Sequence, residues 1–125
     1  LPQTPINNKL AFGFSVPGTH YFPMQFFEAK YVLTADPFPL THVNDPENEM
    51  SHKLNDMFLA VRDEYFALEE TFDMGNGTTF TIWRRTVAPS RAEVEYYLSA
   101  FTEEDAKYPE MFSQVAENWL AARGL

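Results

Sequence analysis

Residues 65–87 decide the fold of this chain, and they read YFALEETFDMGNGTTFTIWRRTV. On both sides of the Gly75-Asn76-Gly77 turn, apolar residues recur at every second position, which is typical of two antiparallel strands. A three-residue loop at 75–77 places Phe72 opposite Phe80, and glycine suits the left-handed backbone of such loops. We therefore expect a central β-hairpin over residues 65–87.

Two opposite charges fall on the apolar face of this hairpin. Strict alternation places Glu70 and Arg84 among apolar residues of the two strands, namely Phe66, Leu68, Phe72, Met74, Phe80 and Ile82. An unpaired inward charge is too costly to keep, so the two either satisfy each other or reach water or a ligand in a cavity. Both interpretations stay open. Trp83 and Arg85 are expected on the opposite face, where a second subunit or the terminal helices would cover them.

Helical signals flank the hairpin on both sides. Asp45 and Pro46 mark the start of a helix over residues 46–64, whose apolar stripe is formed by Met50, Leu54, Met57, Phe58, Val61 and Tyr65. Downstream, Ser90 and Glu93 form a capping box ahead of a helix over 90–101. A last helix over 109–123 is closed by Gly124.

The remaining segments complete one domain. We expect an arm over 1–9, a strand over 10–16, a weakly favoured helix over 21–34, and an edge strand or extended piece over 38–43. The predicted fold is α+β, with residues 10–125 forming a single domain. Its small, mainly antiparallel sheet carries amphipathic helices, in a ferredoxin-like or related arrangement.

Composition excludes several classes of protein. The chain has 125 residues with a formal net charge of -9, which disfavours binding to nucleic acids and to anionic membranes. No cysteine is present, so thiol catalysis and disulfides are excluded. No apolar run reaches the length of a membrane helix. We expect a soluble protein whose compartment stays open, with the cytoplasm slightly favoured; the first residue, Leu1, also leaves open a processed or trimmed chain.

Candidate catalytic groups are few. His42 continues an apolar face and could act as an acid or base, although a satisfied core histidine is the more common role of such a residue. Helical geometry turns Glu49 and His52 toward solvent, so no metal site and no cofactor are expected. The serines lack a nucleophile elbow, and no glycine-rich phosphate loop occurs.

Aromatic residues are abundant, with 12 Phe, 6 Tyr and 2 Trp. Such a number exceeds what a small core needs, and part of it could line an apolar pocket or a subunit interface. The candidate ligand-binding residues are Phe58, Tyr65, Phe72, Phe80 and Trp83. The acidic residues Glu47, Glu49, Glu103, Glu104 and Asp105 indicate the alternative, a non-enzymatic interaction module that binds a basic partner.

The order of a strand over 38–43, a helix over 46–64, the hairpin, and a helix over 90–101 resembles the dimeric α/β-barrel proteins. That family includes antibiotic-biosynthesis-type monooxygenases and EthD-like proteins. Trp83, followed by Ser90-Arg91-Ala92-Glu93 and Tyr97-Leu98-Ser99-Ala100-Phe101, carries the resemblance. It implies a homodimer that binds a small aromatic or hydrophobic molecule.

The resemblance also suggests a chemistry. If the protein is an enzyme, cofactor-free oxygenase or isomerase-like proton transfer is expected, with His42 or Glu70 as the base. Arg84 would then stabilise a developing anion, and Tyr65 or Trp83 would stack on the substrate.

Overall fold

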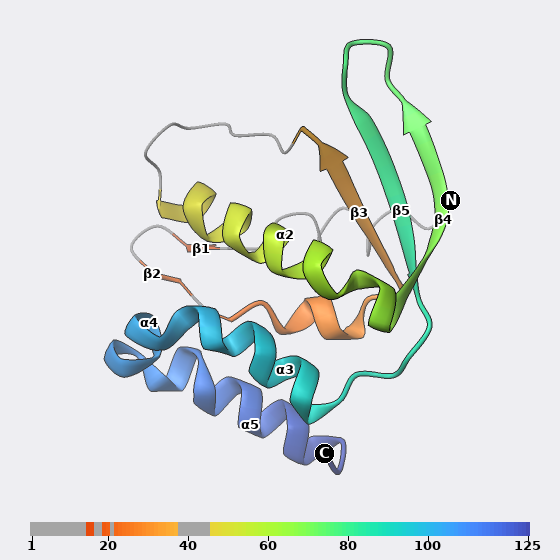
Figure 1. The fold of residues 1–125 in the computed structure, drawn as a ribbon. Coiled ribbons are helices and arrows are strands. Elements are labelled where there is room, and N and C mark those ends of the chain that lie inside the picture. The colour runs from red at the N-terminus through yellow and green to blue at the C-terminus, as the bar shows by residue number, and fades with distance from the viewer. Residues whose placement is uncertain (1–14, 17–18, 21, 38–45) are drawn as a thin grey trace.

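The computed structural model describes residues 15–16, 19–20, 22–37 and 46–125 of the chain. They form a small α+β fold, which confirms the predicted class (Figure 1). The elements, with η for 3-10 helices, are β1 (Ser15–Val16), β2 (Thr19–His20), η1 (Met24–Glu28), β3 (Tyr31–Asp36), α2 (Pro46–Tyr65), β4 (Phe66–Asp73), β5 (Thr79–Arg85), α3 (Arg91–Leu98), η2 (Ser99–Phe101), α4 (Thr102–Lys107), η3 (Pro109–Met111) and α5 (Ser113–Ala122).

The main sheet has the strand order β3-β5-β4, and both pairs are antiparallel. Its hairpin has the predicted register, because Phe72 lies opposite Phe80 and Glu70 lies opposite Ile82. The Met74 amide donates to the Thr78 carbonyl at 2.9 Å and closes the loop over residues 75–77. Both loop glycines have positive φ, as that turn requires.

A β-bulge between Leu68 and Glu70 changes which side chains of the hairpin face the core. The extra residue, Glu69, moves the first half of β4 onto the face that carries Trp83 and Arg85. Val32 and Leu68 both lie opposite Trp83, so these three side chains share that face. Trp83 and Arg85 do lie on the face opposite Glu70 and Arg84, as predicted, and α3 covers Arg85 through Glu93. The prediction of which face meets the core is wrong, because the face of Trp83 packs on it.

Helix α2 lies across this face of the sheet and runs directly into β4 (Figure 1). Its predicted stripe is observed at Leu54 and Phe58, both fully buried, with Met57, Val61 and Tyr65 packed around the same core. Phe58 packs edge-on against Phe66 and Trp83, at centroid distances of 5.1 and 6.2 Å. The helix and the sheet thus share one aromatic core.

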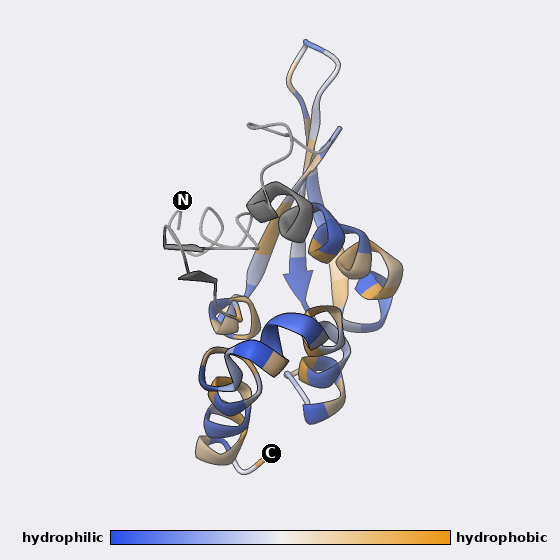
Figure 2. Cartoon of the chain, turned by 90° about the vertical axis from the view of Figure 1, so that its left-hand side faces the viewer, coloured by the Kyte–Doolittle hydropathy of each residue, from blue (hydrophilic) through white to orange (hydrophobic). Residues whose placement is uncertain are grey.

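The C-terminal helices lie below the lower end of the sheet, and the tip of the hairpin points away from them (Figures 1 and 2). Ser90 caps α3 by accepting the Glu93 amide at 3.2 Å. Asp105 caps α5 by accepting the Ser113 amide at 2.9 Å. Gly124, two residues beyond the end of α5, has positive φ, as its closing position predicted.

The segment before the sheet departs from the weakly favoured helix over 21–34. Only Met24–Glu28 is helical, as a 3-10 turn that buries Phe26 and Phe27, and Tyr31–Asp36 forms β3. The strand-like composition of residues 31–34 therefore indicated the correct structure, whereas the helical spacing of the aromatic residues did not. β3 pairs along its whole length with β5. Ser15–Val16, the end of the expected strand over 10–16, form β1. The expected arm over 1–9, the rest of that strand and the extended piece over 38–43, with His42 and Asp45, lie outside the described residues.

Candidate functional site

A groove of about 440 Å³ lies between α2 and the sheet. Residues of β3, β5 and α2 line it, namely Thr34, Ala35, Asp36, Pro37, His52, Asn55, Asp56, Leu59, Arg62, Thr81 and Trp83. Its size falls within the range of pockets that hold small organic molecules. Polar side chains form much of the lining, so the groove is less apolar than the pocket that the sequence predicted.

The sheet supplies a polar and aromatic wall of the groove. Trp83 is almost fully buried, and its indole Nε1 donates to Thr34 Oγ1 at 2.9 Å. This bond fixes the ring plane and satisfies the indole donor in the interior. Thr81 precedes Trp83 by two residues on the same face of β5 and lies opposite Thr34. The wall therefore presents a fixed aromatic surface beside two hydroxyl groups.

Helix α2 supplies the opposite wall. His52, Asn55, Leu59 and Arg62 follow one another at intervals of three or four residues, which places them along one side of the helix. Asn55 is buried, whereas Leu59 is partly exposed. His52 Nδ1 lies 3.3 Å from Asp56 Oδ2. The helix wall thus combines an amide, an apolar side chain and groups of both charges.

Arg62 lies over the indole of Trp83. Its guanidinium carbon is 4.8 Å from the centroid of the ring, which is the geometry of a cation–π contact. The charged group is therefore held at the Trp83 end of the groove. Asp36 ends β3 and Asp56 lies nearer the start of α2, so the two acidic groups mark the other end.

The predicted inward pair does not form. Glu70 is exposed, and Arg84 donates through Nε to Oε1 of Glu69 at 3.0 Å. With the bulge in β4, Glu70 and Arg84 share the sheet face that points away from α2. Neither side chain lines the groove, so the prediction of a charged pair on the core face is wrong.

The predicted ligand-binding residues are dispersed over the molecule. Trp83 lines the groove, whereas Phe58 is fully buried in the core. Phe72 and Phe80 pair with each other on the far face of the hairpin. Tyr65 lies at the end of α2, outside the groove, and His42 falls outside the described residues.

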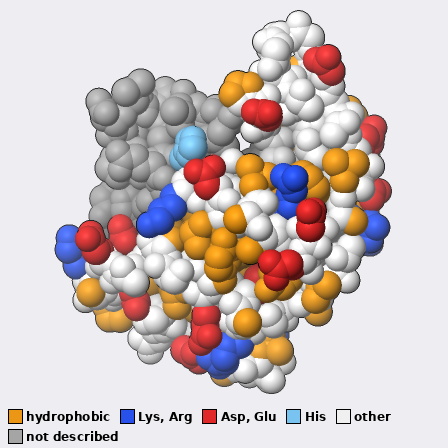
Figure 3. All heavy atoms as spheres, in the orientation of Figure 1, with side chains coloured by type: hydrophobic (Ala, Val, Ile, Leu, Met, Phe, Trp, Pro, Cys, Tyr) orange, Lys and Arg blue, Asp and Glu red, His pale blue; other side chains and the backbone are white. Residues whose placement is uncertain are grey.

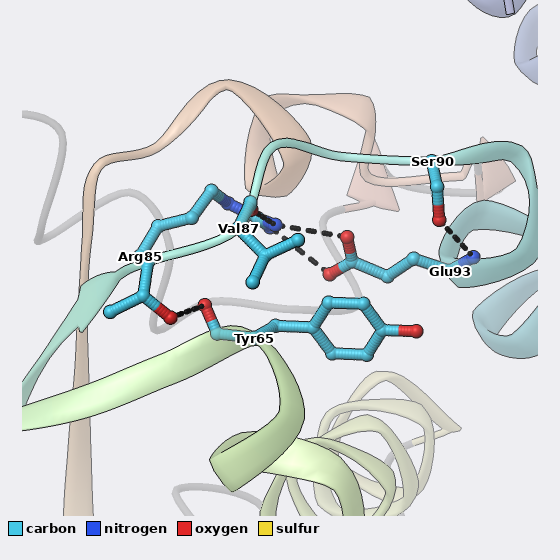
Figure 4. Close-up of polar contacts among 6 residues, drawn as sticks. Tyr65, Arg85, Val87, Ser90 and Glu93 are labelled. Carbon is cyan, nitrogen blue, oxygen red and sulfur yellow. Dashed lines mark hydrogen bonds and ion pairs between the residues drawn. The ribbon is translucent and has the colours of Figure 1, made fainter.

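A second polar cluster joins β5 to α3 (Figure 4). The Arg85 guanidinium binds the Glu93 carboxylate through two hydrogen bonds of 2.9 and 3.1 Å, and it also donates to the Val87 carbonyl. The Glu93 side chain is fully buried, and Arg85 lies over the ring of Phe66 at 4.6 Å. Such a bidentate pair fixes the orientation of two packed elements.

Two phenols lie near this ion pair. Burial raises the pKa of Tyr97, and the Glu93 carboxylate raises that pKa further. The same two causes raise the pKa of Tyr65, whose ring lies alongside the pair in Figure 4. Both groups keep their protons at neutral pH. The ion pair itself connects β5 to α3.

The sequence analysis missed Asn55 and Arg62. Asn55 directly follows Leu54 and Arg62 directly follows Val61, so both lie at the edge of the apolar stripe of α2. That position was the available signal. The position of β3 beside the helix could not be read from the helix alone.

No protein-family model, curated protein or solved structure matches this chain. The likeness to the dimeric α/β-barrel proteins therefore stays a prediction. Among the described residues, no helix has the length and apolar character needed to cross a bilayer. Nor does that part of the chain gather three His, Asp or Glu side chains into a group that could hold a metal ion.

Proposed function

We propose that this protein binds a small planar organic molecule, aromatic in part, in the groove between α2 and the sheet. The observation that carries the proposal is the buried indole of Trp83, fixed by Thr34 within a groove of about 440 Å³. A flat ring can pack beside this wall, while Asn55, Thr81 and the charged groups supply hydrogen bonds. Binding needs no chemistry at Glu70 or Arg84, which lie on the other face.

The two indole groups of the chain offer a direct test. The protein has two tryptophans, so a ¹⁵N-labelled sample gives two indole N–H signals, which the variant Trp119→Phe assigns. We expect aromatic compounds with polar substituents to shift the Trp83 signal and to leave the Trp119 signal in place. Trp119 lies on α5, bound to Glu28, and does not line the groove.

A matched pair of variants locates the binding. Leu59→Tyr fills part of the groove and should weaken binding by about tenfold. Leu68→Tyr makes the same change at an exposed leucine outside the groove, and we expect it to bind as the wild type does. If a fragment collection at about 1 mM leaves the Trp83 signal unmoved, the proposal is wrong.

Two further proposals come from the sequence. We propose that the protein is a homodimer, as the resemblance implies, with the second copy on the sheet face that carries Phe72, Phe80 and Ile82. The alternative is an acidic interaction module that binds a basic partner. One of the acidic residues proposed for it, Asp105, already has a structural role, because it caps α5. Salt-sensitive capture of a basic protein, with no response of Trp83 to small molecules, would favour that alternative.

A further inference from the structure

The arginines of this chain differ in how they are satisfied. Of the five, four donate hydrogen bonds to a carboxylate, in the pairs Arg84–Glu69, Arg85–Glu93, Arg91–Glu117 and Arg123–Glu28. Arg62 does not: within the described residues its one ion pair joins Nε to Asp63 Oδ1 at 3.6 Å, which is too long for a hydrogen bond. The exception is the arginine that lines the groove.

Among the residues that the structure describes, the missing carboxylate hydrogen bond of Arg62 is unusual in such an acidic sequence. The chain carries 18 acidic residues, so a carboxylate partner is easy to supply, and the other arginines have one. Asp63 is almost fully exposed and gives little attraction in water. Instead, the Trp83 ring holds the guanidinium by its face, which leaves its donor edge for another group.

We infer that the molecule bound in the groove carries a carboxylate and that Arg62 binds it. This inference rests on the proposed function. A guanidinium presents parallel N–H donors whose spacing matches the two oxygens of a carboxylate, and such paired bonds are stronger than neutral ones. Stacking on Trp83 fixes the plane of the fork before the ligand arrives, so less side-chain entropy is lost on binding.

The acidic groups of the groove do not oppose this placement. Asp56 lies six residues before Arg62, about 9 Å along the helix axis and about 120° around it. Asp36 lies four residues from Val32, the partner of Trp83, and thus about 13 Å along the strand. A carboxylate bound at Arg62 is therefore remote from both acids.

The spacing of the polar groups also limits the size of the ligand. Asn55 precedes Arg62 by two helical turns, about 10 Å, on nearly the same side of α2. A body of two fused rings spans most of that distance and leaves room for a polar substituent near Asn55. The ligand class is a small aromatic carboxylate, with its ring system between Leu59 and the Trp83 wall.

Three naphthalene compounds of one shape test this inference, with the Trp83 indole signal as the readout. In the wild type we expect 2-naphthoate to bind about tenfold more tightly than 2-naphthamide, and 2-naphthylmethylammonium to bind most weakly. Arg62→Gln should abolish the preference for naphthoate and leave the affinity for naphthamide within about threefold. The unchanged amide affinity also shows that the groove is intact.

Arg84→Gln is the matched control. It removes the same charge at a similarly exposed arginine on the other sheet face, and we expect the affinity for naphthoate to change less than about twofold. If both variants lose the same affinity for naphthoate, only the net charge of the protein matters, and the inference is overturned.

The remaining outcomes separate the inference from the proposed function. If naphthamide or the ammonium compound shifts the Trp83 signal and naphthoate binds no better, the carboxylate inference is wrong while the groove remains a binding site. If none of the three compounds shifts that signal, the inference is wrong, and the fragment screen then decides whether the proposed function falls with it.

Discussion

Glu93 serves two elements at once. Its backbone amide donates to the Ser90 cap, as the capping box predicted, whereas its carboxylate does not return to Ser90 but binds Arg85 of β5. The carboxylate is fully buried, so its charge depends on Arg85 for compensation. The cap and the ion pair together set where α3 begins relative to the sheet.

Removing the charge of Glu93 should therefore destabilise the fold strongly. In Glu93→Gln the Arg85 guanidinium stays buried without its counter-charge, and we expect the free energy of unfolding to fall by about 3 kcal/mol. For a domain of this size that corresponds to a melting temperature about 10 °C lower. Chemical denaturation and calorimetry measure both quantities.

Glu117 provides the comparison for this substitution. It hydrogen-bonds Arg91 at the surface, and Glu117→Gln should lower the melting temperature only slightly, because water replaces an exposed ion pair at little cost. If Glu93→Gln and Glu117→Gln lower the melting temperature equally, the buried ion pair stabilises the fold no more than the exposed one does.

We expect the protein to lose stability at alkaline pH because of the raised pKa of Tyr97. Burial, and then the nearby Glu93, hold the pKa of its hydroxyl above the value of about 10 that the unfolded chain has. Below pH 10 both states keep the proton. As the pH rises above 10, the unfolded state releases a proton that the folded state retains, and the free energy of unfolding falls by about 1.4 kcal/mol per pH unit from this group.

In the variant Tyr97→Phe, the free energy of unfolding should fall less steeply with pH above pH 10. At neutral pH the substitution should cost little, because within the described residues the buried hydroxyl has no hydrogen-bond partner. Urea denaturation between pH 8 and pH 11 measures the slope, with the exposed Tyr108→Phe as the comparison. A slope that stays the same in Tyr97→Phe would contradict the assignment.

At the scale of elements, the hairpin shows how far a sequence pattern reaches. The turn glycines and the pairing of Phe72 with Phe80 followed from local chemistry, and the structure confirms the register at that end. The sequence pattern did not predict which face of the hairpin packs on the core. Strict alternation fails where the bulge inserts Glu69 into β4. The burial of Phe66 against Phe58 fixes which face meets the core, and that contact is tertiary.

The hairpin loop gives a prediction of its own. Gly77 has φ of +84°, and a Cβ added there would meet no atom within 4 Å, so the cost of a side chain lies in the backbone alone. We expect Gly77→Ala to lower the free energy of unfolding by about 1 kcal/mol and Gly77→Asn by less, because asparagine tolerates left-handed backbone. Denaturation curves of the two variants give the order, and an equal cost would refute the backbone explanation.

For the whole molecule, the candidate site could be predicted only in part. Trp83 was predicted to bind a ligand, and it lines the groove, where binding stays a prediction. Asn55 and Arg62 meet it only because β3 pairs with β5 and α2 crosses the resulting sheet, and these arrangements join segments distant in sequence. Helix periodicity located the side of α2 that packs on the core, but not the edge that borders a groove.

The surface bears on the proposed dimer. Acidic side chains are spread over the face shown in Figure 3, in keeping with the net charge of -9, which opposes close approach of two copies. An interface must therefore offer apolar contact that outweighs the repulsion. On the sheet face away from α2, Phe72 and Met74 are exposed beside the half-buried Phe80 and Ile82.

We therefore expect sedimentation equilibrium to show a dimer for the wild type and a monomer for Phe72→Lys at the same concentration. Leu68→Lys makes the same change at an exposed leucine on the opposite sheet face and should leave the dimer intact. Each lysine reduces the negative charge, so a purely electrostatic effect would strengthen association in both variants. Dissociation confined to Phe72→Lys thus reports lost apolar contact, whereas a wild type that sediments as a monomer contradicts the proposed dimer.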